Sequence, residues 1–218
     1  MPNLPDQRQY APATQRNREA ILAVLTAVLP TTGQVLEISS GTGEHAVFFA
    51  QHFPQLSWQP SDISPVALAS IEAWRTHTLA ETELPNLHPP LSLNVCDVPW
   101  PVETEPLATQ LGSIRAIVNI NMIHISPWSS CLGLFAGAAR ILPEGYPLYL
   151  YGPFKQQGQH TAPSNEAFDT SLRSQNSEWG VRDLEAVQEI AANHQFVVQQ
   201  VQPMPANNLS VVFIKQNG

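Results

Sequence analysis

The stretch Val35-Leu36-Glu37-Ile38-Ser39-Ser40-Gly41-Thr42-Gly43 decides the fold of this 218-residue chain. Its apolar beginning is typical of a buried strand, and residues 44–53 carry apolar side chains at helical spacing. Glycines at a strand-to-helix turn let a ligand approach the backbone closely and leave amide groups free. Taken alone, Gly41-x-Gly43-x-x-Ala46 also suits a dinucleotide site or a plain structural turn.

Strands and helices alternate on both sides of this stretch. Strands are expected at residues 35–38, 56–60, 91–95, 114–120, 146–151, 196–201 and 209–215. Helices are expected at residues 18–29, 44–52, 65–80 and 181–193, and another ends near Ile141. The pattern predicts an α/β fold with a Rossmann-like, doubly wound, mostly parallel seven-stranded sheet, an antiparallel last strand and helices on both faces.

Composition narrows the class of protein. Ten Lys and Arg against 18 Asp and Glu give a net charge of -8 and no basic stripe, which argues against nucleic-acid binding. The two cysteines and the scattered histidines match no metal-ligand spacing, so no metal is expected. The longest apolar stretch, residues 20–29, is about half of what a membrane helix needs, and no signal peptide is evident. We expect one cytoplasmic domain, with an N-terminal arm (1–17) and a lid or substrate insertion (154–180).

Acidic residues stand at the ends of three successive expected strands. Glu37 lies inside the first strand, where a buried carboxylate is costly unless a cationic ligand or an amine pairs with it. Asp62 closes the second strand, 19 residues after Gly43, where a carboxylate can accept both hydroxyls of a ribose. Cys96-Asp97-Val98 closes the third strand and places an acid and a backbone amide where an adenine can be read.

Together these motifs resemble the class I S-adenosylmethionine-dependent methyltransferases. The resemblance implies that Glu37 meets the amino acid end of the cofactor, Asp62 the ribose, and Asp97 with the Val98 amide the adenine. The cofactor-binding residues are then Glu37, Ser39, Gly41, Thr42, Gly43, Asp62, Ile63, Asp97, Val98 and Asn119. Ser39 departs from the superfamily, which usually has its first glycine at this position.

A second resemblance covers nearly the whole chain. It is carried by ATQRNR (13–18), NMIHISPW (121–128), YGPFK (151–155), EWGVRD (178–183) and MPANNL (204–209). These stretches look like a domain-of-unknown-function family of methyltransferase-like proteins. The family implies the fold and S-adenosylmethionine as cofactor, with S-adenosylhomocysteine as product, and supplies no substrate.

Substrate residues are expected at the carboxyl ends of the fourth and fifth strands, in the insertion and on the arm. His124 is the candidate catalytic base because its ordinary pKa lies near neutrality, and Asn121 stands beside it as a second catalytic candidate. His124 between two isoleucines also fits a packing role. The candidate substrate-binding residues are Tyr10, Asn17, Arg18, Tyr151, Phe154, Phe168 and Arg182.

The leading hypothesis is a methyltransferase that acts on a small molecule by in-line displacement, without nucleic-acid, membrane or metal partners. Two alternatives stay open. One is a non-catalytic module that binds S-adenosylmethionine or S-adenosylhomocysteine, and the other is a nicotinamide-dependent oxidoreductase.

Overall fold

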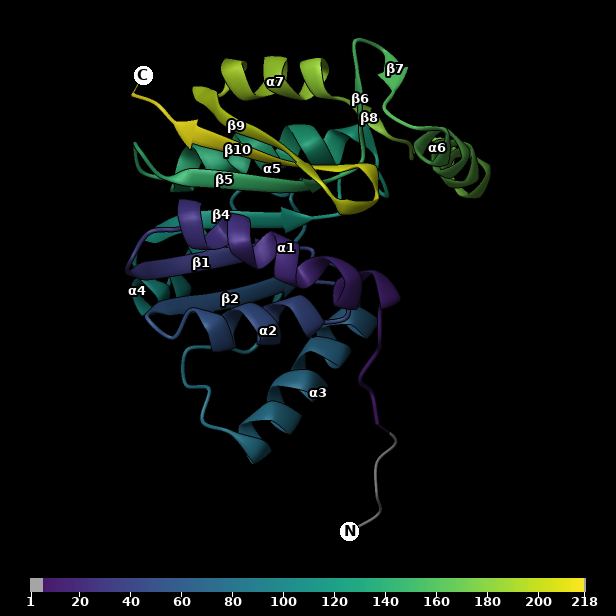
Figure 1. Cartoon of the computed structure of the whole chain (residues 1–218). Coiled ribbons are helices and arrows are strands. Elements are labelled where there is room, and N and C mark those ends of the chain that lie inside the picture. Colours follow the sequence, from purple (N-terminus) through teal and green to yellow (C-terminus); the bar gives the residue numbers. More distant parts are fainter. Residues whose placement is uncertain (1–5, 218) are drawn as a thin grey trace.

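A seven-stranded sheet forms the centre of the molecule in a computed structural model that describes residues 6–217 (Figure 1). Its strands lie in the order β3-β2-β1-β4-β5-β10-β9. Strands β1 to β5 pair in parallel, and β10 runs antiparallel between β5 and β9. The strands are β1 (Gly33–Ile38), β2 (Leu56–Asp62), β3 (Leu91–Ser92), β4 (Ile114–Ile120), β5 (Pro147–Gly152), β9 (Phe196–Met204) and β10 (Asn208–Lys215). The predicted fold class is confirmed.

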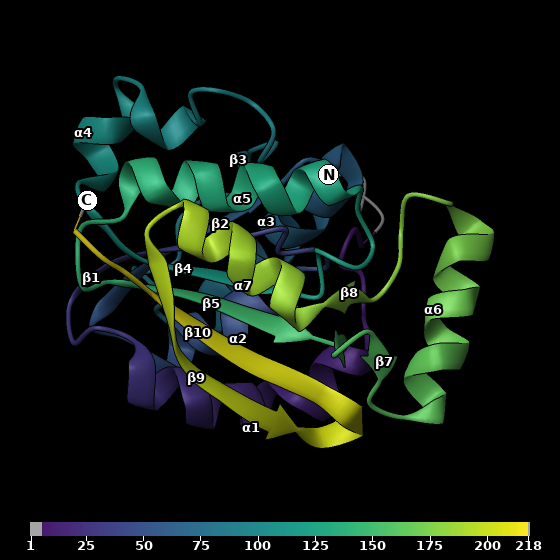
Figure 2. The same ribbon diagram turned by 90° about the horizontal axis from the view of Figure 1, so that it is seen from above.

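Helices cover both faces of the sheet, as Figure 2 shows from above. One face carries α1 (Pro12–Val28), α2 (Glu44–His52) and α3 (Pro65–Glu81), and the other carries α4 (Leu107–Leu111), α5 (Trp128–Ile141) and α7 (Leu184–Asn193). Each layer buries its own apolar core against the central strands. No helix in the described part of the chain is both long enough and apolar enough to span a bilayer.

Helix α1 begins six residues before the position expected from the sequence. Pro12 occupies its first turn, where proline is well tolerated, and Thr14 and Asn17 are buried although they are polar. The polar character of 12–17 led to their assignment to the arm, but Ala13, Thr14, Arg16 and Asn17 line the cavities described below. The described part of the arm is therefore shorter, and residues 1–5 lie outside the described residues.

Strand β3 is shorter than the expected 91–95, because the chain turns away at Leu93. The Asn94 side chain accepts a hydrogen bond from the Cys96 amide at 3.0 Å and so stabilises this turn. Helix α5 fixes the segment that follows. A Cβ atom on Gly137 would lie 2.0 Å from the Trp100 ring, and one on Gly133 would lie 2.5 Å from the Val95 carbonyl oxygen. The two glycines thus let this segment pack directly on α5.

The segment 154–180, which the sequence analysis assigns to a lid or substrate insertion, consists of regular elements. It contains β6 (Phe154–Gln156), β7 (Gln159–His160) and α6 (Pro163–Gln175), and β6 also pairs with β8 (Arg182–Asp183). Helix α6 stands off the carboxyl-end edge of the main sheet (Figures 1 and 2). Buried Asp169 holds it there by accepting a hydrogen bond from the Val181 amide at 2.7 Å and pairing with Lys155 at 3.4 Å.

Candidate functional site

The turn between β1 and α2 has the conformation that a glycine-rich loop requires. Ser39 adopts φ 58°, inside the small left-handed region that L-residues can occupy, so the serine fits where the superfamily usually has glycine. Gly43 caps α2 at φ 89°, and a Cβ atom there would lie 2.8 Å from the Cα of Ile71. Glycine at 43 is therefore needed both for its backbone conformation and for the close approach of α3.

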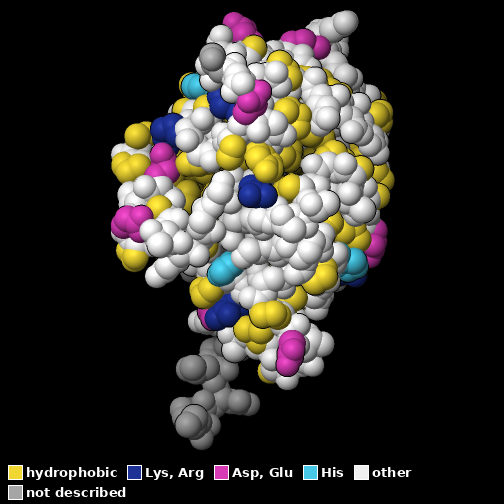
Figure 3. Space-filling model, turned by 90° about the vertical axis from the view of Figure 1, so that its left-hand side faces the viewer, with side chains coloured by type: hydrophobic (Ala, Val, Ile, Leu, Met, Phe, Trp, Pro, Cys, Tyr) yellow, Lys and Arg dark blue, Asp and Glu magenta, His cyan; other side chains and the backbone are white. Residues whose placement is uncertain are grey.

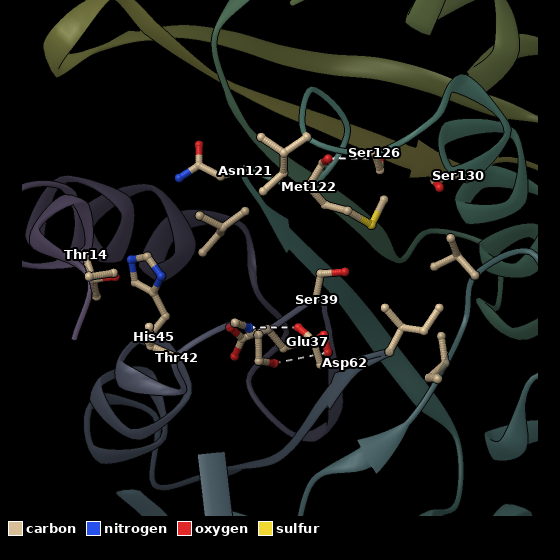
Figure 4. A pocket seen from close by; sticks show the side chains of 18 of the residues that line it. Thr14, Glu37, Ser39, Thr42, His45, Asp62, Asn121, Met122, Ser126 and Ser130 are labelled. Atoms are coloured by element: carbon tan, nitrogen blue, oxygen red, sulfur yellow. Dashed lines mark hydrogen bonds between the residues drawn. The ribbon is translucent and has the colours of Figure 1, made fainter. Parts of the chain in front are cut away.

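A cavity of about 420 Å³ opens beside this turn, at the carboxyl ends of β1, β2 and β4. In Figure 4, Thr14 and His45 lie on one side of it and Ser126 and Ser130 on the other, with Glu37 and Asp62 between them. We call it the first cavity. Its lining consists of Ala11, Ala13, Thr14, Glu37, Ser39, Ser40, Gly41, Thr42, His45, Asp62, Ile63, Leu93, Asn94, Val95, Ile120, Asn121, Met122, Ile125, Ser126 and Ser130.

Glu37 is a buried acid in the wall of the first cavity. One carboxylate oxygen accepts a hydrogen bond from the indole nitrogen of Trp58 at 2.6 Å, and no cationic side chain pairs with it in the described residues. Burial raises the pKa of the Glu37 carboxyl to about 7, and the charge of Asp62 adds to the rise. A cation bound in the cavity would supply the missing partner.

Asp62 ends β2 with its carboxylate held by two backbone amides. The Gly41 amide donates to one oxygen at 3.0 Å, and the Ser64 amide donates to the other at 2.9 Å. Each carboxylate oxygen keeps further lone pairs, so the oriented group can still accept hydrogen bonds from two neighbouring hydroxyls.

Asp97, Val98, Gly43 and Asn119 do not line the first cavity. Because β3 ends early, Leu93, Asn94 and Val95 face the space that the sequence assigned to Asp97 and Val98. Asp97 is exposed and accepts a hydrogen bond from the Asn94 side chain at 3.2 Å. Asn119 donates to the Ile38 carbonyl oxygen at 3.0 Å and so ties β4 to β1.

A second cavity, of about 760 Å³, lies between α1, α6 and the loop that joins β9 to β10. It shares Ala13, Asn121 and Ile125 with the first cavity. Asn121 lies in the left-handed region at φ 61°. The complete lining is Ala13, Arg16, Asn17, Asn121, His124, Ile125, Tyr151, Pro153, Ser164, Asn165, Phe168, Pro205, Ala206, Asn207 and Asn208.

His124 borders the second cavity. Its side chain is buried, and its ring meets Phe168 edge to face at 5.7 Å between centroids. The Nδ1 atom has no hydrogen-bond partner among the described residues. Burial lowers the pKa of His124 to about 4, and the positive charge of Arg182 contributes to the shift.

Of the seven candidate substrate-binding residues, the second cavity brings together Asn17, Tyr151 and Phe168. Tyr10 packs instead on Trp74, and Arg18 stacks over Phe48 with 4.7 Å from its guanidinium carbon to the ring centre. Phe154 is buried in the core that α5 and α7 cover.

Arg182 lies outside both cavities. It donates to the carbonyl oxygens of Ile123 at 2.9 Å and of Ser126 at 2.6 Å. It thereby holds the loop that carries His124.

Sequence reasoning missed several lining residues. His45 borders the first cavity as a second buried histidine, whose pKa burial lowers to about 4, and its ring nitrogen hydrogen-bonds Asn17 at 2.9 Å. In the second cavity, Asn207 and Asn208 come from the MPANNL stretch. Their membership in that stretch was the one sequence signal that could have pointed to them.

Figure 3 shows the end of the molecule opposite the site, at the amino ends of the parallel strands. On that face, Lys and Arg side chains are scattered and do not gather into a patch. Within residues 6–217, no three His, Cys, Asp or Glu side chains come together in a way that would hold a metal ion.

Comparison with solved structures places the fold among methyltransferases. The O-methyltransferase family 2 protein of Planctomyces limnophilus, solved with apigenin, gives a TM-score of 0.74 at 19% identity, over 93% of this chain and 57% of that one. Human N-acetylserotonin methyltransferase, solved with S-adenosylmethionine, gives a TM-score of 0.71 at 12% identity, over 94% of this chain and 53% of that one. The magnesium protoporphyrin IX methyltransferase of Synechocystis, with bound S-adenosylhomocysteine, gives a TM-score of 0.67 at 11% identity, over 95% of this chain and 89% of that one.

The chain thus spans little more than half the length of the first two of these proteins. At these identities the likeness shows the fold. The family comparison reaches further, because the model of the family described as "Protein of unknown function (DUF938)" matches residues 8–215. With a match over nearly its whole length, the chain belongs to the DUF938 family and has the Rossmann-like fold of the S-adenosylmethionine-dependent methyltransferases.

Proposed function

We propose that this protein is an S-adenosylmethionine-dependent methyltransferase that acts on a small molecule. The observation that carries the proposal is the placement of Glu37 and Asp62 in one cavity with the β1–α2 turn. When bound, S-adenosylmethionine supplies an electrophilic methyl group. Two of the structural relatives, the human and the Synechocystis enzymes, were solved with this cofactor or its product.

The residues of the first cavity fit such a ligand. The buried Glu37 carboxylate would pair with an amino group, and the oriented Asp62 carboxylate would accept the two ribose hydroxyls. Gly41 leaves open space where a side chain would begin, since a Cβ atom there would have no neighbour within 4 Å. The ligand can therefore lie directly against the backbone of the turn.

The second cavity favours an enzyme over a module that only binds the cofactor. It adjoins the first cavity at Asn121 and Ile125, so a second small molecule can lie next to the first. His124 on its wall has an unprotonated ring that can accept a hydrogen bond from an O–H or N–H nucleophile, and its pKa of about 4 makes it a weaker base than an ordinary histidine. Asn121, which faces both cavities, would help to align the two molecules.

Replacement of Asp62 tests the cofactor assignment. We expect Asp62→Ala to weaken the binding of S-adenosylhomocysteine about ten- to a hundredfold, because a charged acceptor for two hydroxyls costs roughly 1.5–3 kcal/mol when it is lost. Asp97→Ala is the matched control and should leave the affinity unchanged, since Asp97 is exposed and outside the cavity. Isothermal titration calorimetry measures both.

The same titrations with NADH test the oxidoreductase alternative. Binding of NADH without binding of S-adenosylhomocysteine would refute the cofactor assignment. Methyl transfer from radiolabelled S-adenosylmethionine into a metabolite extract then tests catalysis, and a protein that binds the cofactor tightly without any transfer would be a binding module.

A further inference from the structure

The charges and hydrogen-bonding groups of the second cavity restrict what it can bind. None of its described lining residues is acidic, and Arg16, an exposed residue on α1, is its one permanently charged member. A cationic ligand would lose hydration without gaining a counter-charge, whereas a multiply charged anion would find a single exposed guanidinium.

The amide side chains in the cavity present acceptor atoms. Asn165 donates through Nδ2 to the Asn207 carbonyl oxygen at 2.8 Å, and a backbone carbonyl can only accept, so this contact fixes the orientation of the amide. Asn207 donates through Nδ2 to the Ser164 hydroxyl oxygen at 3.1 Å. No hydrogen bond from another described residue reaches the Oδ1 atom of Asn165 or Asn207. These oxygens remain available to a ligand that brings O–H or N–H donors.

Apolar side chains complete the lining. Pro153, Phe168 and Pro205 border the same space as the amides, together with the ring of Tyr151. Phe168 is 41% exposed, so a ligand could cover part of its ring. Such surfaces favour a flat apolar body, since aromatic and proline rings stack on it at little cost in side-chain entropy.

We propose that the second cavity binds an uncharged, hydroxylated ring compound whose O–H groups donate to the amide oxygens of Asn165 and Asn207. The site itself stands on the geometry of this cavity. Only the role of the bound compound as methyl acceptor rests on the proposed function.

Four probes of similar size test this specificity. Para-hydroxybenzyl alcohol is neutral with two donors, its dimethyl ether is neutral without donors, para-hydroxybenzoate is anionic and tyramine is cationic. Ligand-observed NMR titration in the presence of S-adenosylhomocysteine gives the four dissociation constants. We expect the neutral alcohol to bind tightest and its dimethyl ether about tenfold more weakly, because the ether leaves the amide oxygens unpaired.

A variant that adds a charge to the cavity wall tests whether the probes bind in the second cavity. Asn207→Asp keeps the backbone conformation at φ 59°, which aspartate also tolerates, and the new carboxylate can accept from the Ser164 hydroxyl. Tyramine should then bind about two- to fivefold more tightly and para-hydroxybenzoate correspondingly more weakly, the size expected for an exposed ion pair. Asn193→Asp, an exposed position at the end of α7 outside the cavity, is the control and should change neither affinity.

The results separate this inference from the proposed function. Tightest binding of a charged probe, equal binding of the alcohol and the ether, no binding of any probe, or equal effects of the two variants would overturn the specificity proposed here. Titration of S-adenosylhomocysteine into the same samples reports on the cofactor site independently. A protein that binds this compound but not the alcohol would therefore retain the proposed function and lose the further inference.

Discussion

At the scale of single residues, the ionised Glu37 carboxylate destabilises the ligand-free fold because it is buried, and a cationic ligand that pairs with it would offset this cost. The unfolded carboxyl ionises near its ordinary pKa of 4.5, whereas the folded one has its pKa raised to about 7 by burial. The unfolded state therefore binds fewer protons between these values, and folding stability contributed by this group falls as the pH rises from about 4.5 through 7. Above pH 7 the ligand-free protein keeps the full reduction in folding stability that the ionised Glu37 causes.

Replacement of Glu37 with glutamine should remove this loss. We expect Glu37→Gln to raise the urea midpoint of the ligand-free protein more at pH 8 than at pH 5, and to weaken S-adenosylhomocysteine binding by about tenfold or more through loss of the charged partner. Glu144→Gln, at an exposed turn, should change neither quantity. A variant with a lower midpoint at pH 8 and unchanged affinity would show that the Glu37 carboxylate is a structural group.

His124 has a different pH dependence from the one that its residue type suggests. An ordinary histidine would give a rate that rises with pH near 6.5. With the pKa lowered to about 4 by burial, the imidazole is already a free base at pH 6. If His124 is the base, turnover should be flat between pH 6 and 8 and should decline only as the pH falls towards 4.

The variant His124→Gln should lower turnover by about a hundredfold, the lower end of the usual effect of losing a positioned base, because the lowered pKa weakens His124 as a base. The affinity for S-adenosylhomocysteine should stay the same, because His124 lines the second cavity and not the first. Steady-state methyl transfer and calorimetry check the two statements. Normal turnover in the variant would assign His124 to packing against Phe168.

At the scale of elements, residues 8–11 form a strap across α3 that leads into α1. The Gln9 amide donates to the Ser70 hydroxyl oxygen at 2.8 Å, and the Trp74 indole donates to the Gln9 carbonyl oxygen at 2.9 Å. The Ala11 amide donates to the Glu44 carboxylate at 2.6 Å, next to the β1–α2 turn. The strap thus positions Ala11 and the first turn of α1 at the first cavity.

Deletion of residues 1–10 should weaken S-adenosylhomocysteine binding about two- to tenfold, the range for losing a few partly exposed hydrogen bonds that position the wall. The thermal midpoint of the ligand-free protein should fall by only a few degrees, since the deletion spares the buried positions of α1. Deletion of residues 1–17 would instead remove Thr14 and Asn17 from the core and destabilise the fold. Equal affinity of the full chain and the protein that lacks residues 1–10 would argue against a role for the strap.

The sequence predicted elements better than their ends. Apolar strands, the glycine turn and the alternation with helices were enough for the sheet and its antiparallel strand. The turn at Leu93 depends on how α5 accepts Val95 and Trp100 at its two glycines, and such tertiary packing leaves no local pattern. Adenine contacts were therefore expected from Asp97, whereas Asn94 faces the cavity.

The roles of residues that are held in place by long-range contacts could not be predicted from the sequence either. The sequence suggested Arg182 as a ligand-binding residue, but it donates to three carbonyl oxygens, two of which lie more than fifty residues away in the chain. That Glu37 and Asp62 line one cavity follows from the meeting of the ends of neighbouring parallel strands at one edge of the sheet, a rule that needs no side-chain geometry.

At the scale of the whole molecule, three buried groups with large pKa shifts contribute most clearly to the pH dependence of stability between pH 4.5 and 7, and the lowered pKa values of His88 and His194 act in the same direction as those of the two buried histidines. His45 and His124 have folded pKa values of about 4, below the ordinary 6.5, so the stability they contribute is present above pH 6.5 and is lost as the pH falls towards 4. Glu37 acts in the opposite direction over the range from 4.5 to 7. Below pH 6.5 the two histidines together change the folding stability more than the single Glu37 carboxyl does, so stability falls as the pH falls.

The ligand-free protein should therefore be most stable near pH 6.5, with a steeper decline on the acid side. Urea denaturation at half-unit steps from pH 4.5 to 8 measures this profile. The double variant His45→Gln/His124→Gln should lose the acid-side decline that these groups cause. A parent protein with its highest midpoint at pH 4.5 would contradict the assignment of both histidines as buried and neutral.

Asn17 links the two halves of the site. Its side chain hydrogen-bonds His45 in the first cavity, and it lines the second cavity next to the Tyr151 hydroxyl, whose pKa it helps to hold down against the effect of burial. A ligand that fixes this amide from one side fixes it for the other side as well. Occupancy of the two cavities is then thermodynamically reciprocal: the factor by which one ligand tightens the other must be the same in both directions. Departure of either product would then weaken the binding of the other by that same factor, through a single turn of α1.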